Sequence, residues 1–153
     1  MSNAAQEAGR VRTGALLQRL YRTSNLKHFF QSNEHSMESA DFCAYINRLA
    51  REKGEAPERI ILRGGIERTF GHQLFNGTRN PSRDKVIQLA FGFEMNVEQT
   101  QHLLQRAGRS SLYPRIKRDA AILFCLNRRA SFLDTQVALQ ELGLSLLGGT
   151  KNE

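Results

Sequence analysis

The spacing of apolar residues predicts an all-α protein. Apolar side chains recur every three to four residues along most of the chain, as one face of an α-helix requires. No stretch alternates apolar and polar residues between hairpin turns, so no β-strand is expected. Glycines follow several of the periodic segments, where helices commonly stop, and only three prolines interrupt the 153 residues.

Two short amphipathic helices are expected near the N-terminus, over about 14–21 and 26–30. The run that follows, 31–36, is polar throughout and predicts a linker. We therefore assign residues 1–37 to a helical N-terminal extension and linker that precede the core.

The central segment, 38–95, predicts a core of four helices with clear stop signals between them. They are expected over about 39–53, 57–63, 67–76 and 82–93. Gly54 and Gly77 follow the first and third of these helices, as left-handed C-terminal caps do. Gly64 and Gly65 together predict a sharp turn between the second and the third.

Residues 96–147 predict three more helices, which we expect to pack on the core or to form a dimer interface. They are expected over about 96–107, 115–128 and 131–142. Asn96 and Gln99 show the spacing of a capping box at the start of the first.

Within the helix over 115–128, the residues assigned to the buried face are Ile116, Ala120, Leu123 and Phe124. Residues 148–153 are expected to form a frayed tail. No internal repeat is expected in the chain.

The distribution of basic residues is more informative than the net charge of +7. The chain has 17 Arg and 5 Lys, and Arg favours bidentate partners such as phosphate. Residues 59–85 carry a local charge of +4, whereas 38–95 as a whole carry only +1. Taken alone, the charge leaves nucleic-acid binding and an ordinary solvated surface equally open.

Several other classes of protein are not expected. Cys43 and Cys125 lie inside apolar helical patterns, which predicts reduced thiols and a cytoplasmic protein. No membrane span or signal peptide pattern is present. The histidines and cysteines share no metal-ligand spacing, and no phosphate-binding glycine loop or catalytic grouping occurs. We therefore expect no enzymatic activity, metal, cofactor, small-molecule ligand or membrane partner.

The helix over 67–76 has one apolar and one polar face. Ile66, Phe70 and Leu74 recur at a spacing of four and should face the core. The opposite face carries Arg68, Thr69, His72, Gln73 and Asn76. Such side chains read base edges, because Arg pairs with guanine and Gln or Asn with adenine. The helix, turn and helix over 56–77 therefore suggest a DNA-reading unit.

The run IERTFGHQLFNGTRNPS, residues 66–82, resembles the lambda-repressor-like helix-turn-helix proteins, in particular the Cro/C1 (XRE) class of bacterial regulators. In that class the recognition helix ends at a glycine, followed by a basic-polar loop and Asn-Pro-Ser. The resemblance covers roughly 41–97 and implies a five-helix DNA-binding domain, here with additional N- and C-terminal helices. Through the pattern over 112–120, the whole chain also resembles a group of Firmicutes-type regulators of unassigned role.

The resemblance implies a sequence-specific transcriptional regulator and a role for each matching position. The recognition helix would lie in the major groove and supply base contacts from Arg68, Thr69, His72 and Gln73. Its end and the following loop would contact phosphates through Asn76, Thr78, Arg79 and Asn80, and the basic residues Arg83 and Lys85 are further candidates. The implied partners are double-stranded DNA and a second copy of the chain, because one recognition helix reads few base pairs.

Two positions depart from the pattern of the class. Ile61 stands where the class commonly packs a small alanine, and Gly71 falls inside the recognition helix, where a larger residue is usual. Glycine in a helix interior costs about 1 kcal/mol relative to alanine. An alternative therefore stays open, a non-catalytic protein-interaction adaptor on the same fold, which the near-neutral charge of 38–95 also suits.

Overall fold

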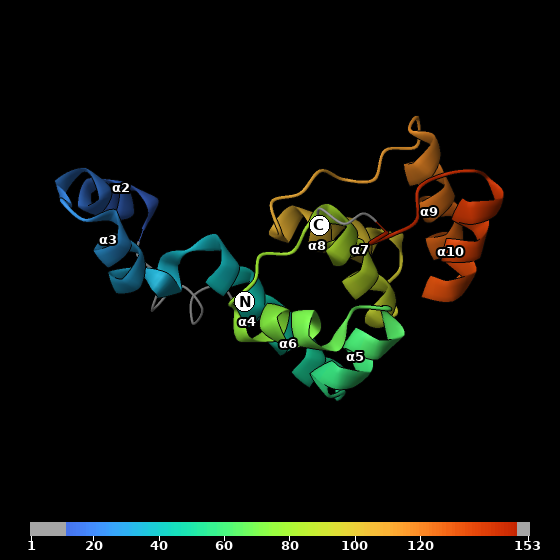
Figure 1. Cartoon of the computed structure of the whole chain (residues 1–153), viewed down its shortest axis with the longest axis horizontal. Helices are drawn as coiled ribbons and strands as arrows, with labels where there is room; N and C mark the ends of the chain where they lie inside the picture. The colour runs from blue at the N-terminus through green and yellow to red at the C-terminus, as the bar shows by residue number, and fades with distance from the viewer. Residues whose placement is uncertain (1–11, 150–153) are drawn as a thin grey trace.

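The computed structural model describes residues 12–149, and every regular element in that range is helical, which confirms the all-α prediction. The elements are α2 (Thr13–Arg22), α3 (Leu26–Ser32), the 3-10 helix η1 (Glu34–Ser36), α4 (Glu38–Lys53), α5 (Pro57–Arg63), α6 (Arg68–Asn76), α7 (Arg83–Gly92), α8 (Val97–Arg106), α9 (Lys117–Asn127) and α10 (Phe132–Glu141). In Figure 1 the α2–α3 hairpin projects from one end of an elongated molecule, and α9 and α10 lie at the other end. The parts of the predicted N-terminal extension and tail at 1–11 and 150–153 fall outside the described residues.

Several residues predicted to begin or end helices do so in the structure. Gly54 and Gly77 adopt left-handed backbone, with φ of 73° and 84°, at the ends of α4 and α6. The Asn96 side chain accepts the N–H of Gln99 at 2.8 Å, and the Gln99 side chain accepts the N–H of Asn96 at 2.9 Å. Ser82 likewise caps α7. Local capping chemistry therefore fixes where these helices begin and end.

Helices α4 to α8 enclose the main hydrophobic core. Ile46 of α4, Ile60 of α5 and Leu103 of α8 have no exposed surface, and burying such a side chain contributes about 1.5–3 kcal/mol. Helices α5 and α7 approach closely because Gly92 has no side chain, since a Cβ there would collide with the carbonyl oxygen of Ile60. This close approach places the turn between α5 and α6 against α7.

The structure overturns the expectation that the chain contains no internal repeat. Residues 83–112, which include α7 and α8, recur as residues 118–147, which include α9 and α10, at a constant offset of 35. We call them the first and second repeats; ten of their thirty aligned residues are identical, with no gap. The identical pairs are Arg83/Arg118, Asp84/Asp119, Ile87/Ile122, Thr100/Thr135, Gln101/Gln136, Leu104/Leu139, Gln105/Gln140, Gly108/Gly143, Ser110/Ser145 and Leu112/Leu147.

Equivalent side chains in the two repeats make the same contacts. The fully buried hydroxyls of Thr100 and Thr135 each donate to the backbone carbonyl four residues earlier, at 2.7 and 2.9 Å. Gln101 and Gln136 each exchange two hydrogen bonds with the backbone of the leucine eleven residues later. The two helical hairpins are therefore equivalent in structure as well as in sequence.

Two reciprocal ion pairs join the repeats where α7 and α9 begin. The guanidinium of Arg83 donates to both carboxylate oxygens of Asp119 at 3.0 and 2.8 Å. The guanidinium of Arg118 donates in the same way to Asp84 at 2.8 and 2.7 Å. Because each repeat supplies the arginine of one pair and the aspartate of the other, an approximate twofold axis relates them, as in an isologous dimer.

The Asp119 carboxylate is almost completely buried, with 2% of its side chain exposed. Burial alone would raise the pKa of Asp119, but hydrogen bonds from Arg83 and from the N–H of Tyr113 hold it below its usual range. The equivalent backbone N–H just after the second repeat, that of Gly148, donates to Asp84 at 3.1 Å. Gly148, which was assigned to a frayed tail, is therefore held by the joint between the repeats.

The predicted buried face of α9 is wrong. Asp119 and Ile122 are buried, whereas Ile116 and Phe124 are 51% and 59% exposed. Ala120 and Leu123, also assigned to that face, are only partly buried. Because Asp119 must reach Arg83, the helix turns that side toward the core and leaves Phe124 on the opposite side.

Candidate nucleic-acid interface

Helix α6 begins one residue later than predicted, because Glu67 caps it instead of joining it. The Glu67 carboxylate accepts the N–H groups of Phe70 at 2.8 Å and Thr69 at 2.9 Å, and these bonds lower the pKa of Glu67. A carboxylate at this position also complements the positive end of the helix dipole. The cap fixes where the first turn of α6 starts, and so where Arg68 and Thr69 project.

The buried face of α6 lies slightly to one side of the predicted one. Leu74 is buried as expected, but Phe70 is only half-buried, and Phe75 is buried although it was not predicted. The exposed side of the Phe70 ring carries two cations, with Arg79 Cζ at 5.0 Å and Lys85 Nζ at 5.5 Å from its centroid. Phe70 therefore forms an aromatic platform for two positive charges at the end of α6.

Gly71 and Ile61 fit each other across the contact between α5 and α6. A Cβ added to Gly71 would lie 2.5 to 2.9 Å from three side-chain carbons of Ile61, which is closer than such atoms pack. The absent side chain on α6 therefore makes room for the large one on α5. The two departures from the pattern of the class, Ile61 and Gly71, therefore compensate each other in a single contact.

The residues predicted to contact bases lie on the outward side of α6. Arg68 and Thr69 are exposed, and His72 and Gln73 are half-buried. Arg68 is not free of acidic neighbours, because its Nε lies 2.6 Å from Oε1 of Glu58, and the same oxygen lies 4.0 Å from His72 Nε2. Sequence reasoning missed Glu58, since it belongs to the preceding helix.

The residues predicted to contact phosphates gather at the C-terminal end of α6 and in the loop after it. Asn76, Thr78, Arg79 and Asn80 are all exposed. The Asn76 side chain accepts the N–H of Thr78 at 3.0 Å and its hydroxyl at 2.7 Å, which stiffens the loop. Arg79 donates from Nε to Gln73 at 3.0 Å, so one residue from each predicted set is in direct contact.

Arg83 has other partners than the predicted phosphate. Besides its ion pair with Asp119, its guanidinium donates to the carbonyls of Ser110 at 3.0 Å and Ser111 at 2.8 Å. A guanidinium has five donors, and four bonds of Arg83 are made within the protein. We therefore leave Arg83 out of the interface, whereas Lys85 stays with Arg79 on the Phe70 ring.

Two residues that the sequence did not single out support the turn before α6. The buried Gln88 donates from Nε2 to the carbonyls of Gly64 and Gly65, both at 3.2 Å. The Phe132 ring of α10 packs against Gly65, where a Cβ would collide with it. The turn between α5 and α6 is thus held by one residue of each repeat.

The C-terminal end of α6 is held from α4. Cys43 Sγ and Asn47 Nδ2 donate to the Phe75 carbonyl at 3.0 and 2.7 Å, which satisfies a carbonyl that the helix leaves without a partner. Burial raises the pKa of the Cys43 thiol. Cys43 and Cys125 are both free thiols, as predicted.

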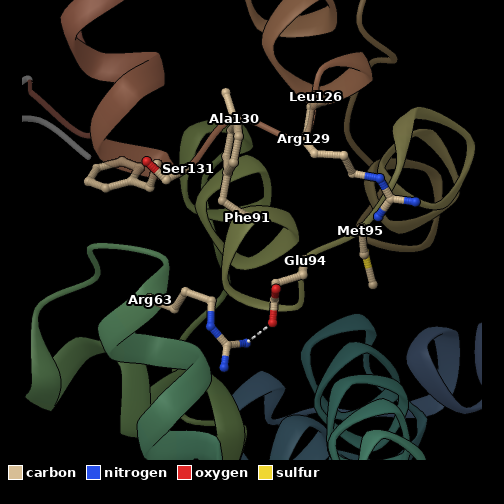
Figure 2. Close-up of a pocket in the computed structure, with 9 residues that line it drawn as sticks. Arg63, Phe91, Glu94, Met95, Leu126, Arg129, Ala130 and Ser131 are labelled. Atoms are coloured by element: carbon tan, nitrogen blue, oxygen red, sulfur yellow. Dashed lines mark ion pairs between the residues drawn. The ribbon is translucent and has the colours of Figure 1, made fainter.

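A small cavity of about 190 Å³ lies between the C-terminal ends of α7 and α9 (Figure 2). Equivalent residues of the two repeats line it: Phe91 with Leu126, Glu94 with Arg129, and Met95 with Ala130. Glu94 and Arg129 both have positive φ, at 59° and 61°, and Arg63 pairs with Glu94 at 2.9 Å. None of the predicted site residues lines this cavity.

Comparisons with protein-family models, curated proteins and solved structures return no match to this chain. Within residues 12–149, no helix has the length and apolar character needed to cross a bilayer. The same part of the chain contains no group of three or more His, Cys, Asp or Glu side chains placed to hold a metal ion. The assignment of function therefore depends on the residues of α6 and its surroundings.

Proposed function

We propose that the protein is a sequence-specific DNA-binding transcriptional regulator of the lambda-repressor-like helix-turn-helix class, with α6 in the major groove. The observation that carries this proposal is the outward face of α6. It presents Arg68, Thr69, His72 and Gln73, whose side chains match the hydrogen-bonding groups of base edges. The face holds no carboxylate of its own after the capping Glu67.

The charges at the end of α6 suit a phosphate backbone. Arg79 and Lys85 lie on the Phe70 ring, and the exposed polar residues Thr78 and Asn80 flank Arg79 in the loop. Phosphate contacts of this kind position a recognition helix without reading sequence. The base-reading and phosphate-binding groups therefore follow one another along α6 and its loop.

The packing of α5 on α6 removes a difficulty for this proposal. The class commonly places a small residue on the first helix and a larger one on the recognition helix. Here Ile61 and Gly71 exchange the sizes, and the two helices still pack without a gap at that contact. Gly71 is thus explained by packing, and a recognition helix that has lost its function is not needed to account for it.

A protein-docking role for the same fold is the second candidate. The observation that favours it is the pair of Glu58 with Arg68, which neutralises the strongest base-reading group. Both side chains are more than half exposed, so a phosphate or guanine competes with Glu58 for Arg68 at little cost. The DNA-binding role therefore requires that Arg68 change partner on binding.

The experiment is a selection from random duplexes, followed by fluorescence anisotropy of the selected and random duplexes over a series of salt concentrations. A protein making on the order of six phosphate contacts should show a log-log salt slope near −5. Arg68→Ala should cost roughly 1–3 kcal/mol on the selected duplex and relax one base position. Arg79→Ala should weaken both duplexes similarly and reduce the slope by about one.

Arg128→Ala is the matched control, because Arg128 stacks on Phe124 of α9 and belongs to neither predicted set. It should leave both affinities unchanged. Equal losses on both duplexes for Arg68→Ala would mean that α6 does not read sequence. No binding of any duplex at 50 mM salt would favour the docking role.

A further inference from the structure

The α2–α3 hairpin, which we call the arm, has an apolar face that nothing in the described chain covers. Helix α2 is amphipathic but buries no residue, and α3 buries only Phe29. Tyr21 is 71% exposed, Leu26 53% and Phe30 50%. Helices this short are marginal in water unless their apolar face packs on something. The exposed apolar side chains of the arm therefore indicate that it packs on a partner.

The charge of the arm restricts what that partner is. Arg19, Arg22 and Lys27 are its charged residues, Arg12 directly precedes it, and no Asp or Glu occurs over 12–33. Two arms placed side by side would bring like charges together, which opposes direct pairing of arm with arm. The surface that fits the arm is apolar and acidic.

Helix α10 presents such a surface at the other end of the molecule. Leu133 and Val137 are 71% and 54% exposed. Asp134 and Glu141 are the charged residues of 130–147, so this segment carries −2 and no cation. Its outer face is therefore both apolar and acidic, which complements the arm.

The first repeat shows that these apolar residues are not required by the fold. The positions equivalent to Leu133 and Val137 are Glu98 and His102, and they are also exposed. The same helix position is thus polar in the first repeat, where it faces water, and apolar in the second. Exposed apolar side chains grouped in this way mark an interaction surface.

The arm and α10 of one chain lie at opposite ends of its longest axis (Figure 1), so an arm does not pack on its own α10. Two copies placed side by side in opposite directions bring each arm to the α10 of the other. The contact then occurs twice about a twofold axis, which doubles the buried area toward the roughly 1,000 Å² of a specific interface.

We propose that the protein dimerises by exchanging its arms, with each arm packed on the outer face of α10 of a second copy. The exposed apolar side chains of both surfaces come together, and Arg22 and Lys27 meet the acidic rim of α10. The proposal goes beyond DNA binding and does not depend on it, because the argument uses neither α6 nor its loop.

The test is a charge exchange in the full chain, followed by sedimentation velocity without DNA over 1–300 μM protein. Arg22→Glu with Lys27→Glu should weaken the dimer at least tenfold, and so should Asp134→Lys with Glu141→Lys. The protein with all four changes should recover a dimer within threefold of the wild type. Arg115→Glu with Lys117→Glu, which reverses two exposed cations elsewhere, is the matched control and should change nothing.

Three results would overturn the proposal: a wild type that stays monomeric up to 300 μM, an arm variant that weakens a dimer while the α10 variant does not, or no recovery in the fourfold variant. Circular dichroism identifies any variant that unfolds, and Tyr21→Ser with Leu133→Ser then tests the same interface without charge changes. A monomer that still binds duplex DNA would reject arm exchange alone. A dimer that binds no DNA would reject the proposed function alone.

Discussion

The two repeats place nearly the same hairpin in two different surroundings. Leu89 of the first has no exposed surface, whereas its equivalent in the second, Phe124, is 59% exposed. The same contrast separates Ala107, at 7%, from Leu142, at 64%. Helix α5 packs on α7, whereas the helices that pack on α9 are α10 and, less extensively, α8. Burial at these positions is therefore set by the neighbouring helices, and the hairpin itself does not determine it.

The comparison also shows what does not change between the repeats. The threonine and glutamine contacts to backbone are the same in both, and so are the arginine and aspartate at the start of each first helix. These groups satisfy polar atoms inside the hairpin or join it to its counterpart. Both hairpins need these contacts whatever surrounds them. The residues that make them are therefore the same in the two repeats, whereas the residues on the outer faces of the hairpins differ.

The largest expected effect comes from breaking the joint between the repeats. Asp119→Ala leaves Arg83 without its counter-ion in a site where the carboxylate is 2% exposed, and should lower stability by about 3 kcal/mol or more. Asp84→Ala, at a carboxylate that is 10% exposed, should cost less. Urea unfolding followed by circular dichroism measures both. Equal losses of under 1 kcal/mol would mean that the joint does not stabilise the fold.

The next effect sharpens the contrast in burial. Leu89→Ala should cost about 2–5 kcal/mol, because it opens a cavity in the core. Phe124→Ala, at the equivalent position, should stay within about 0.5 kcal/mol of the wild type. Thermal unfolding at a low protein concentration separates the two. A large loss for Phe124→Ala would show that α9 is covered in solution.

The smallest effect concerns the two residues with positive φ. Arg129→Gly should raise stability by about 0.5–1 kcal/mol, because glycine adopts left-handed backbone without strain. Glu94→Gly should gain nothing, because it also removes the pairs of Glu94 with Arg63 at 2.9 Å and Lys53 at 3.6 Å. Differential scanning calorimetry resolves changes of this size. A gain at Glu94 equal to that at Arg129 would show that the ion pairs contribute nothing.

Local signals made much of the fold predictable. The caps at Ser82 and Asn96 and the stops at Gly54 and Gly77 act within a few residues of chain, so the sequence contains the whole interaction. The outward side chains of α6 were predictable for the same reason, since a spacing of 3.6 residues determines which face a residue shares. The specific use of that face for DNA stays a prediction.

Interactions between distant residues were not predictable in this way. An aspartate in the first turn of a helix is usually exposed, and nothing near Asp119 in the sequence points to its partner Arg83, 36 residues earlier. Because Asp119 was expected to be exposed, the buried face of α9 was predicted on the wrong side of the helix. The repeat was missed because its identical residues are scattered and many of them are polar. The spacing of apolar residues, from which the helices were predicted, does not reveal such identities. Glu58 was missed beside Arg68 because it comes from the neighbouring helix.

The reciprocal joint also sets an order of events during synthesis. Arg83 is made 36 residues before Asp119, and a ribosome adding about 5–20 residues per second needs roughly 2–7 seconds to cover that distance. Arg118 is synthesised after Asp84 with nearly the same delay, since 34 residues separate them. A nascent chain that ends between the repeats therefore exposes half of an ion-pair cluster, and the first hairpin gains its final stability only after the second has been made.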